Sequence, residues 1–169
     1  AGGDMEAAVD ILRARGAAKA AKRSAREASE GAIGSYIHMG GRIGVLVEVN
    51  CETDFVARND QFQELARNLA IHVAMANPTY VSREQVPAEV VEAERGALAR
   101  EAEAEGKPAN VVERMVEGRL GKFFEEVCLL EQPYIRDDKK TVETLLHEAG
   151  ATMGENIQVG NFARVAIGE

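Results

Sequence analysis

Long apolar segments are absent from this 169-residue sequence, in which no run approaches the roughly 20 residues of a membrane-spanning helix. A recognisable secretory signal is absent as well. Only two cysteines occur, Cys51 and Cys128, which is too few for a disulfide scaffold in a chain of this size. We therefore expect no contact with a membrane, and a reducing compartment such as the cytoplasm.

An excess of positive charge is also lacking. The chain has 20 Lys and Arg residues against 28 Asp and Glu residues, so its formal net charge is −8 at pH 7. General affinity for nucleic acid needs a basic face that displaces counterions, and this balance argues against one. One local basic segment, from Arg13 to Arg26, holds six basic residues and no acidic residue. A solvated helix face is favoured there over a phosphate-binding patch, and we expect no direct nucleic-acid contact.

Sequence signals of covalent chemistry are missing. There is no Gly-rich nucleotide-binding loop and no Gly-x-Ser-x-Gly nucleophile elbow. The histidines His38, His72 and His147 have no metal-ligand spacing with the cysteines. Cys51 and His38 could in principle form a nucleophile pair across a hairpin, but a small apolar residue at a strand end is the favoured interpretation of Cys51. No catalytic residue, metal or cofactor is predicted, which leaves a binding or regulatory module.

What the sequence does contain is a pattern of helices and strands. Apolar residues make up 46% of the chain and charged residues 28%, which is ordinary for a globular domain. In the first half, periodicity predicts two helical segments and then two strands: Asp4–Arg15, Ala17–Glu30, Ala32–His38 and Gly41–Asn50. We expect Gly16 to stop the first helix. Gly40 and Gly41 supply the positive φ angles of a tight turn, so the two strands should form a hairpin.

The second half predicts more helices and a last strand. Helical spacing favours helices at Asp60–Asn77, Ala88–Glu105 and Ala109–Leu130, and one after Thr141. The acidic helix at residues 88–105 is interpreted as an exposed arm, and residues 137–140 as a polar loop. The last strand places apolar residues on one face, with a candidate bulge at Gly160 and Asn161: Ile157, Val159, Ala163, Val165 and Ile167. Three strands cannot enclose a core alone, so we predict an α+β fold with helices covering a three-stranded antiparallel sheet.

The stretch after the second strand carries the clearest candidate for a binding site. Thr53 and Asp54 suit the start of a helix, because a side-chain oxygen accepts from free backbone N–H groups and a carboxylate complements the helix dipole. Phe55 and Val56 follow at a predicted surface turn. They can form a hydrophobic staple on their own helix, or a probe that enters a partner. The local pattern favours the staple.

The run Cys51-Glu52-Thr53-Asp54-Phe55-Val56-Ala57-Arg58 is more specific than this local pattern. It resembles the signature of the elongation factor Ts family, the guanine-nucleotide exchange factors for elongation factor Tu. Further segments similar to the family follow the same order along the chain: Gly16–Lys22, Gly41–Glu48, Gly106–Pro108, Met115–Leu120, Leu130–Pro133 and Gly154–Ile157. The resemblance covers essentially the whole chain and favours the probe interpretation of Phe55.

The resemblance implies a function without bond making or breaking. Phe55 would wedge between helices of the Tu nucleotide domain with the help of Asp54, and the segment Thr53–Val56 would dislodge the magnesium that Tu holds beside GDP. Met153 and Gly154 would form a neighbouring contact with Tu. The implied protein is not an enzyme, works in the bacterial cytoplasm, and binds Tu in its GDP-bound and nucleotide-free forms.

Two departures from the family pattern shape the expected domains. The chain opens Ala1-Gly2-Gly3 without a methionine, and only the last helix of the family's N-terminal module, related to ubiquitin-associated domains, is recognisable. We therefore expect residues 1–16 to be a remnant of that module, 17–30 a linker helix, and 31–169 a core and dimerisation domain. Longer relatives carry a duplicated core, whereas this sequence has a single copy.

A chain with one core copy is expected to form a homodimer through its core sheet or that sheet's uncovered face. Without the resemblance, the best alternative is a non-catalytic α+β module that binds protein or RNA. A hydrolase that uses Cys51 is a distant third.

Overall fold

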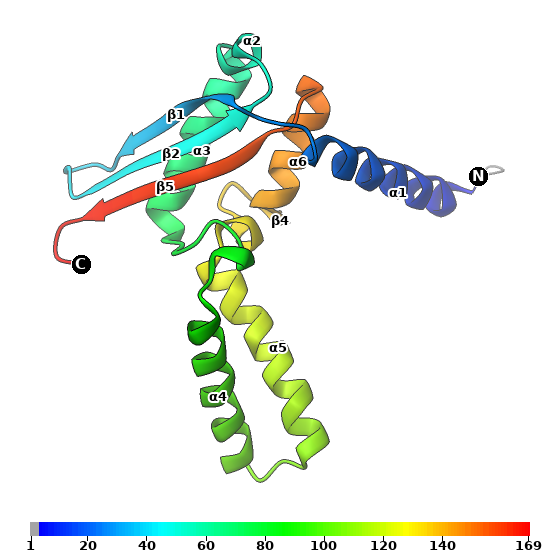
Figure 1. Cartoon of the computed structure of the whole chain (residues 1–169), viewed down its shortest axis with the longest axis vertical. Helices are drawn as coiled ribbons and strands as arrows, with labels where there is room; N and C mark the ends of the chain where they lie inside the picture. Colours follow the sequence, from blue (N-terminus) through cyan, green and yellow to red (C-terminus); the bar gives the residue numbers. More distant parts are fainter. Residues whose placement is uncertain (1–3) are drawn as a thin grey trace. The chain divides into compact units, whose positions relative to one another are not determined.

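The computed structural model describes residues 4–169, apart from the side chains of residues 6–10, 12–15 and 17. Residues 1–3, the first residues of the expected N-terminal module, lie outside the described residues. The fold is α+β, as predicted, and divides into two compact units (Figure 1). The first unit comprises the described residues up to Ala74 together with Thr144–Glu169, and the second comprises Met75–Glu143.

Helix α1 runs without interruption over Met5–Ser24, so the predicted stop at Gly16 is wrong. Alanine and lysine around this glycine favour helix, and one interior glycine costs only about 1 kcal/mol relative to alanine. The helix ends where the Ser24 hydroxyl donates back to the carbonyl of Ala21 at 2.9 Å. The helix predicted for residues 17–30 therefore ends before residue 30, and a strand begins at Glu30.

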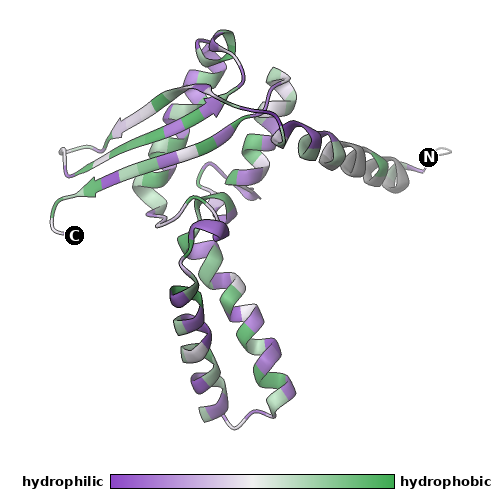
Figure 2. Cartoon of the chain, in the orientation of Figure 1, coloured by the Kyte–Doolittle hydropathy of each residue, from purple (hydrophilic) through white to green (hydrophobic). Residues whose placement is uncertain are grey.

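Three antiparallel strands form the sheet of the first unit: β1 (Glu30–Ile37), β2 (Ile43–Cys51) and β5 (Gln158–Ala166), with β2 in the middle. The predicted glycine turn between β1 and β2 is confirmed, with φ of +83° at Gly40 and +68° at Gly41. Hydrophobic and hydrophilic colours alternate along these strands (Figure 2). One face of the sheet is therefore suited to a core and the other to solvent or a partner.

Strand β5 contains the predicted bulge. Glu48 of β2 pairs with Asn161, but the next residue, Val49, pairs with Val159, so Gly160 is the extra residue. A one-residue insertion moves all later side chains to the opposite face. We predicted that the apolar residues of this strand share one face. Val159, before the bulge, is buried, but Ala163, Val165 and Ile167, after the bulge, are exposed, so the prediction is wrong for these three residues.

The core of the first unit lies between β2 and two helices. The inward residues of β2, Val45, Val47 and Val49, are 0–2% exposed. Helix α3 (Asp60–Ala76) buries one side, which includes Phe62 and Leu69, and its backbone passes directly over Gly34 of β1. Helix α6 (Val142–Met153) leads into β5, as predicted. Helices therefore cover one face of the sheet.

The second unit is built on a helical hairpin of α4 (Ala88–Ala104) and α5 (Ala109–Val127). The predicted exposed arm is α4, but it is only partly exposed, because Ala102 is completely buried against Val112 and Val116 of α5. Arg119 on α5 adds ion pairs to Glu101 and Glu105, both at 3.0 Å. Among the described residues, no helix combines the length and apolarity required to cross a membrane.

The ends of this hairpin are closed by short elements. Arg83 of the 3₁₀ turn η1 (Arg83–Gln85) pairs with Glu131 of the 3₁₀ turn η2 (Leu129–Glu131) and also lies over the ring of Phe124, 4.4 Å from its centre. Strands β3 (Pro133–Tyr134) and β4 (Asp137–Thr141) form a small hairpin, so the predicted loop at residues 137–140 is wrong. An ion pair of Lys140 with Asp137, at 3.3 Å, stabilises it.

Candidate functional site

The single turn α2 (Asp54–Ala57) follows β2 at one end of the sheet. Thr53 precedes it in an extended conformation, and its hydroxyl oxygen accepts from the backbone N–H of Val56 at 3.3 Å. The N–H groups of Ala57 and Arg58 donate to the backbone carbonyls of Thr53 and Asp54, each at 3.1 Å. The predicted helix cap at Thr53 is therefore confirmed.

The other end of this turn is tied to α3. Asn59 begins that helix by accepting from the N–H of Gln61 at 2.8 Å, and the side chain of Gln63 donates to the carbonyl of Ala57 at 2.6 Å. Ala57 itself is 7% exposed, so it is the residue through which the turn contacts the core. The turn is thus held on both sides of Phe55.

Phe55 projects into solvent, with 83% of its surface exposed. The staple interpretation is therefore wrong, because a staple would bury this ring against its own helix. Burial of a phenylalanine is worth about 1.5–3 kcal/mol, and this contribution is unused in the chain alone. The ring is consequently available to a partner.

Asp54 lies beside this ring and pairs with Arg58, four residues further on, at 3.1 Å. Both side chains are well exposed, 44% for Asp54 and 79% for Arg58. Exposed pairs of this kind contribute little to stability. The carboxylate of Asp54 can therefore exchange Arg58 for a group of a partner at low cost.

The predicted contact Met153–Gly154 forms the end of α6. Gly154 adopts a φ of +78°, which is unfavourable for other residues, and its N–H donates to the carbonyl of Gly150 at 2.9 Å. Met153 is half-buried and Gly154 is exposed. This turn leads directly into Glu155, whose carboxylate contacts the loop before α2.

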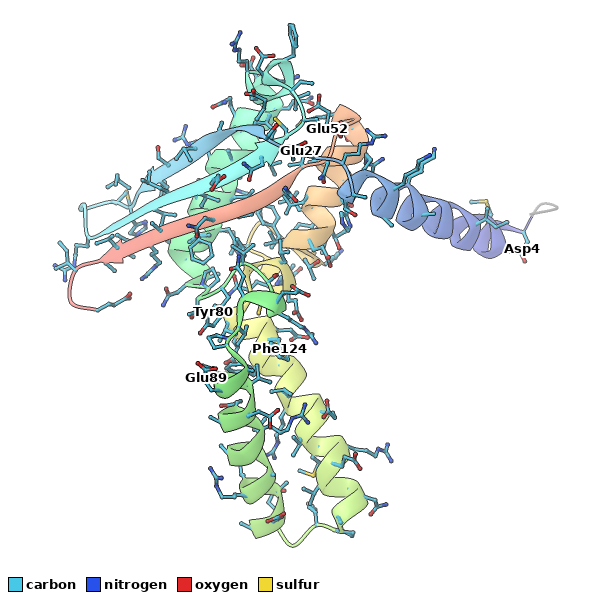
Figure 3. All side chains as sticks on the ribbon, viewed as in Figure 1. Asp4, Glu27, Glu52, Tyr80, Glu89 and Phe124 are labelled. Carbon is cyan, nitrogen blue, oxygen red and sulfur yellow. The ribbon has the colours of Figure 1, made fainter. Side chains whose placement is uncertain are left out.

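Hydrogen bonds join the loop before α2 to the loop after α6. The carboxylate of Glu155 accepts from the N–H groups of Glu52 (3.0 Å) and Thr53 (3.1 Å) and from the hydroxyl of Thr53 (2.6 Å). In return, the carboxylate of Glu52 accepts from the N–H of Asn156 at 2.6 Å. Figure 3 marks Glu52 at this junction. The two predicted contact segments, more than 90 residues apart in sequence, are thus brought together.

The segment after α1 belongs to the same network. Arg26 donates to Glu52 at 3.2 Å and to the carbonyl of Gly154 at 3.4 Å. The buried side chain of Asn156 donates to the carbonyls of Ser24 and Arg26, at 3.4 and 2.7 Å. The end of α1 is therefore anchored at the candidate site.

The electrostatics of this network favour an ionised Glu52. The hydrogen bond from the N–H of Asn156, assisted by Arg26, lowers the pKa of Glu52 below its ordinary value of 4.5. A lowered pKa in the folded state means that the contribution of Glu52 to stability is complete above its unfolded pKa and is lost as the pH falls through the folded value. At neutral pH the contribution of Glu52 to stability is therefore complete.

Sequence reasoning did not find Arg26, Glu52, Glu155 or Asn156 as members of this site. Glu52 and Glu155 stood inside the recognised segments, but the sequence contains no sign that they contact each other. Such a sign is absent because a carboxylate that binds a loop backbone follows no fixed spacing, unlike a helix cap.

A sequence model of the family described as Elongation factor TS matches residues 17–169. Curated proteins named Elongation factor Ts are similar over the whole chain: that of Carboxydothermus hydrogenoformans is 59% identical, and the chain spans 78% of its length. That of Geobacter sulfurreducens is 53% identical over 99% of this chain and 77% of its own length. That of Thermoanaerobacter sp. (strain X514) is 57% identical over all of this chain and 83% of its own length.

The chain belongs to the elongation factor Ts family.

Members of the elongation factor Ts family are nucleotide exchange factors for elongation factor Tu, and the chain is accordingly not an enzyme. The nucleophile considered in the sequence analysis, Cys51, fits this. Cys51 is completely buried, and burial raises the pKa of its thiol above 9.0, so the thiol stays protonated. Ile43, which accepts from the N–H of His38, and Cys51 stand at opposite ends of β2, roughly 26 Å apart at ~3.3 Å per residue, so Cys51 and His38 form no pair.

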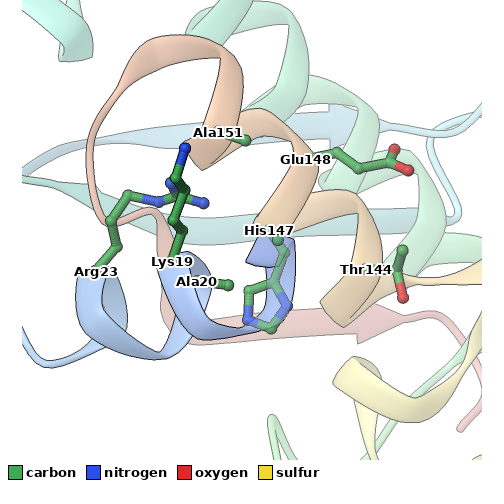
Figure 4. A pocket seen from close by; sticks show the side chains of 8 residues that line it. Lys19, Ala20, Arg23, Thr144, His147, Glu148 and Ala151 are labelled. Atoms are coloured by element: carbon green, nitrogen blue, oxygen red, sulfur yellow. The ribbon is translucent and has the colours of Figure 1, made fainter. Parts of the chain in front are cut away.

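In the described part of the basic segment of this elongation factor Ts family member, Lys19, Lys22 and Arg26 are exposed and Arg23 is half-buried. Lys19 and Arg23 line a groove of about 430 Å³ between α1 and α6, opposite His147 (Figure 4). Arg26 pairs with Glu52 instead. In the part of the chain that the structure describes, no three His, Cys, Asp or Glu side chains are grouped so that they could hold a metal ion.

Proposed function

We propose that this chain releases GDP from elongation factor Tu by inserting Phe55 between helices of the Tu nucleotide domain. In this proposal Asp54 assists the insertion, and the segment Thr53–Val56 disturbs the magnesium that Tu holds beside GDP. Met153 and Gly154 make a neighbouring contact. Magnesium bridges phosphate oxygens and protein ligands, so displacing it loosens the nucleotide.

The observation that carries this proposal is the 83% exposure of Phe55 on a turn whose two ends are both fixed. A large apolar ring held in solvent is unfavourable unless a partner buries it. The ring is the outermost apolar group of α2, and Ala57 takes the buried position. These features fit a probe that enters a cleft.

The energetics follow from linkage. A factor that binds nucleotide-free Tu better than GDP-bound Tu weakens GDP binding by the same factor. Each ~1.4 kcal/mol of this difference is worth tenfold in affinity. Burial of one phenylalanine supplies only ~1.5–3 kcal/mol, so the contacts of Asp54, Met153 and Gly154 have to share the work.

Phe55→Ala is expected to reduce the acceleration of GDP release from Tu about tenfold, because the lower estimate of the burial energy of the ring, ~1.5 kcal/mol, is lost. The measurement is the release rate of fluorescently labelled GDP from Tu at several concentrations of the parent chain and of the variant. The fold should not change, since Phe55 contributes little buried surface to it.

Met39→Ala is the matched control for this experiment. Met39 is 86% exposed in the turn between β1 and β2, at the end of the sheet opposite α2, so its loss should leave GDP release unchanged. Equal acceleration by the parent and by Phe55→Ala would reject the wedge while keeping exchange activity. No acceleration by the parent would reject the proposed function itself.

The uncovered sheet face is proposed as the contact between two copies of the chain. We define this outer face by its exposed apolar residues: Ile33, Ile37, Leu46, Ala163 and Val165. Leu46 lies in the middle strand, opposite Ala163 of β5, and is 53% exposed; Val165 is 71% exposed. A contiguous apolar face of this kind on a soluble domain is typical of an interface, and a second copy offers the same apolar surface.

Leu46→Glu is expected to convert the dimer into a monomer. In a two-fold interface each of the two copies carries the substitution. Leu46→Glu would therefore place two carboxylates in an apolar contact. Light scattering at micromolar concentration measures the mass of the parent, of Leu46→Glu and of Met39→Glu, which adds the same charge outside the face and should stay dimeric. A parent chain that is monomeric under these conditions would refute the dimer.

We also propose a division of the chain into three segments, from its resemblance to the elongation factor Ts family. Residues 1–16 correspond to part of the family's N-terminal module, 17–30 to its linker and 31–169 to its core and dimerisation domain. We propose action in the cytoplasm, on GDP-bound and nucleotide-free Tu, without direct contact to nucleic acid. The anchoring of the end of α1 by Asn156 supports a linker that is fixed to the core.

A further inference from the structure

The turn that carries Phe55 cannot hold its own conformation. Helix α2 has four residues, and an isolated helix of fewer than about 12–15 residues is marginal in water. The ring itself adds no packing, because it is exposed. A side chain on an unfixed turn would have to be ordered when a partner binds, which lowers affinity. The direction of Phe55 must therefore be set by groups outside α2.

Glu155 is the group that reaches this turn from another part of the chain. Its carboxylate accepts two backbone N–H groups and one hydroxyl from Glu52 and Thr53, the two residues that precede α2. Bonds to a charged acceptor are about twice as strong as bonds between neutral groups. Glu155 also directly follows Gly154, so one residue connects the two segments that are proposed to contact Tu.

The hydroxyl of Thr53 passes this restraint on to α2. A hydroxyl has one proton and two lone pairs. The Thr53 proton is donated to Glu155 at 2.6 Å, which leaves the lone pairs free for the N–H of Val56 at 3.3 Å. Glu155 thus orients the oxygen that caps the first turn of α2. Glu52 completes the arrangement in the opposite direction, through the N–H of Asn156.

We propose that Glu155 is a positioning residue: it holds the loop before α2 so that Phe55 and the Met153–Gly154 turn present one rigid surface to Tu. This inference rests on the proposed function of Phe55. It assigns to Glu155 no contact with Tu; the effect of Glu155 on GDP release depends on the position of Phe55 relative to the Met153–Gly154 turn.

Glu155→Ala tests the restraint in the free chain, without Tu. Loss of the carboxylate is expected to raise the hydrogen-exchange rates of the Glu52 and Thr53 amides about tenfold or more, measured residue by residue by NMR. Amides of β2 such as that of Val47 should keep their protection, which shows that the sheet stays folded. Glu64→Ala removes an exposed carboxylate of α3 and should change none of these rates.

A double-mutant cycle tests the positioning. In the parent chain, Glu155→Ala is expected to reduce acceleration of GDP release about tenfold. Combined with Phe55→Ala, it should reduce the remaining acceleration less than threefold, because no wedge is left to position. Glu155→Gln should recover most of the activity, since its amide oxygen can accept the two backbone N–H groups and its NH₂ can donate to a rotated Thr53 hydroxyl.

The outcomes distinguish a failure of this inference from a failure of the proposed function on which it rests. Tenfold reductions by Glu155→Ala in both backgrounds would show that Glu155 acts independently of Phe55 and would overturn the proposal. Unchanged exchange of the Glu52 and Thr53 amides would also overturn it, whatever the activity. A parent chain that does not accelerate GDP release would reject the proposed function, and positioning for it, while the amide rates still report on the restraint itself.

Discussion

Gly34→Ala is expected to lower the Tm of the chain by about 6–12 °C, a large effect for a single methyl group. A Cβ at Gly34 would lie 2.2 Å from the carbonyl oxygen of Ala66 and 2.4 Å from its carbonyl carbon. Both sides of this contact are backbone, so no side chain can turn away. Overpacking costs 1–3 kcal/mol or more; because neither side of this contact can yield, we use ~3 kcal/mol, and 1 kcal/mol corresponds to ~2–4 °C in a chain of this size.

Gly118→Ala is the control, with an effect of opposite sign. Gly118 lies in the middle of α5, is exposed, and has no atom within 4 Å of an added Cβ. Alanine there should stabilise the helix by about 0.5–1 kcal/mol. Calorimetry or circular dichroism measures both variants. A Gly34→Ala chain that melts at the parent temperature would contradict the direct packing of α3 on β1.

The β1–β2 hairpin was predictable because local and tertiary requirements agree there. Alternating residues of β2 such as Val45 and Val47 mark one buried face, and the glycines Gly40 and Gly41 mark the turn. Strand β5 was only partly predictable. Its apolar residues fall on both faces, and the bulge at Gly160 moves Val165 from the core to the surface.

Two errors concern features that apolar periodicity does not reveal. Strand β4 is a run of charged residues with no alternation, and its pairing with β3 depends on the chain returning beside Tyr134. Helix α1 continues through Gly16 because the propensity of its neighbours outweighs one glycine.

The candidate site was predictable in its residues but not in its construction. The run around Phe55 carries a specific family signature, yet its local pattern favours a staple, which the 83% exposure of the ring excludes. The role of Glu155 depends on its distance to Glu52 and Thr53 in space, across about 100 residues of chain. Only the structure brings these groups together.

The affinity of the chain for the two states of Tu is the second large effect, and it tests the wedge most directly. Exchange by Phe55 requires that nucleotide-free Tu be bound more tightly than GDP-bound Tu. If Phe55 contributes ~1.5–3 kcal/mol and its neighbours add a comparable amount, the ratio of the two dissociation constants should be roughly 100-fold or more. Phe55→Ala should lower this ratio about tenfold.

Titration calorimetry of the chain into Tu with saturating GDP and magnesium, and into Tu stripped of nucleotide, gives both dissociation constants. The account predicts at least about 100-fold tighter binding to nucleotide-free Tu, with most of the loss in Phe55→Ala appearing in that state. Equal affinity for both states would contradict it, because a partner that binds both equally cannot shift GDP binding, however tightly it binds.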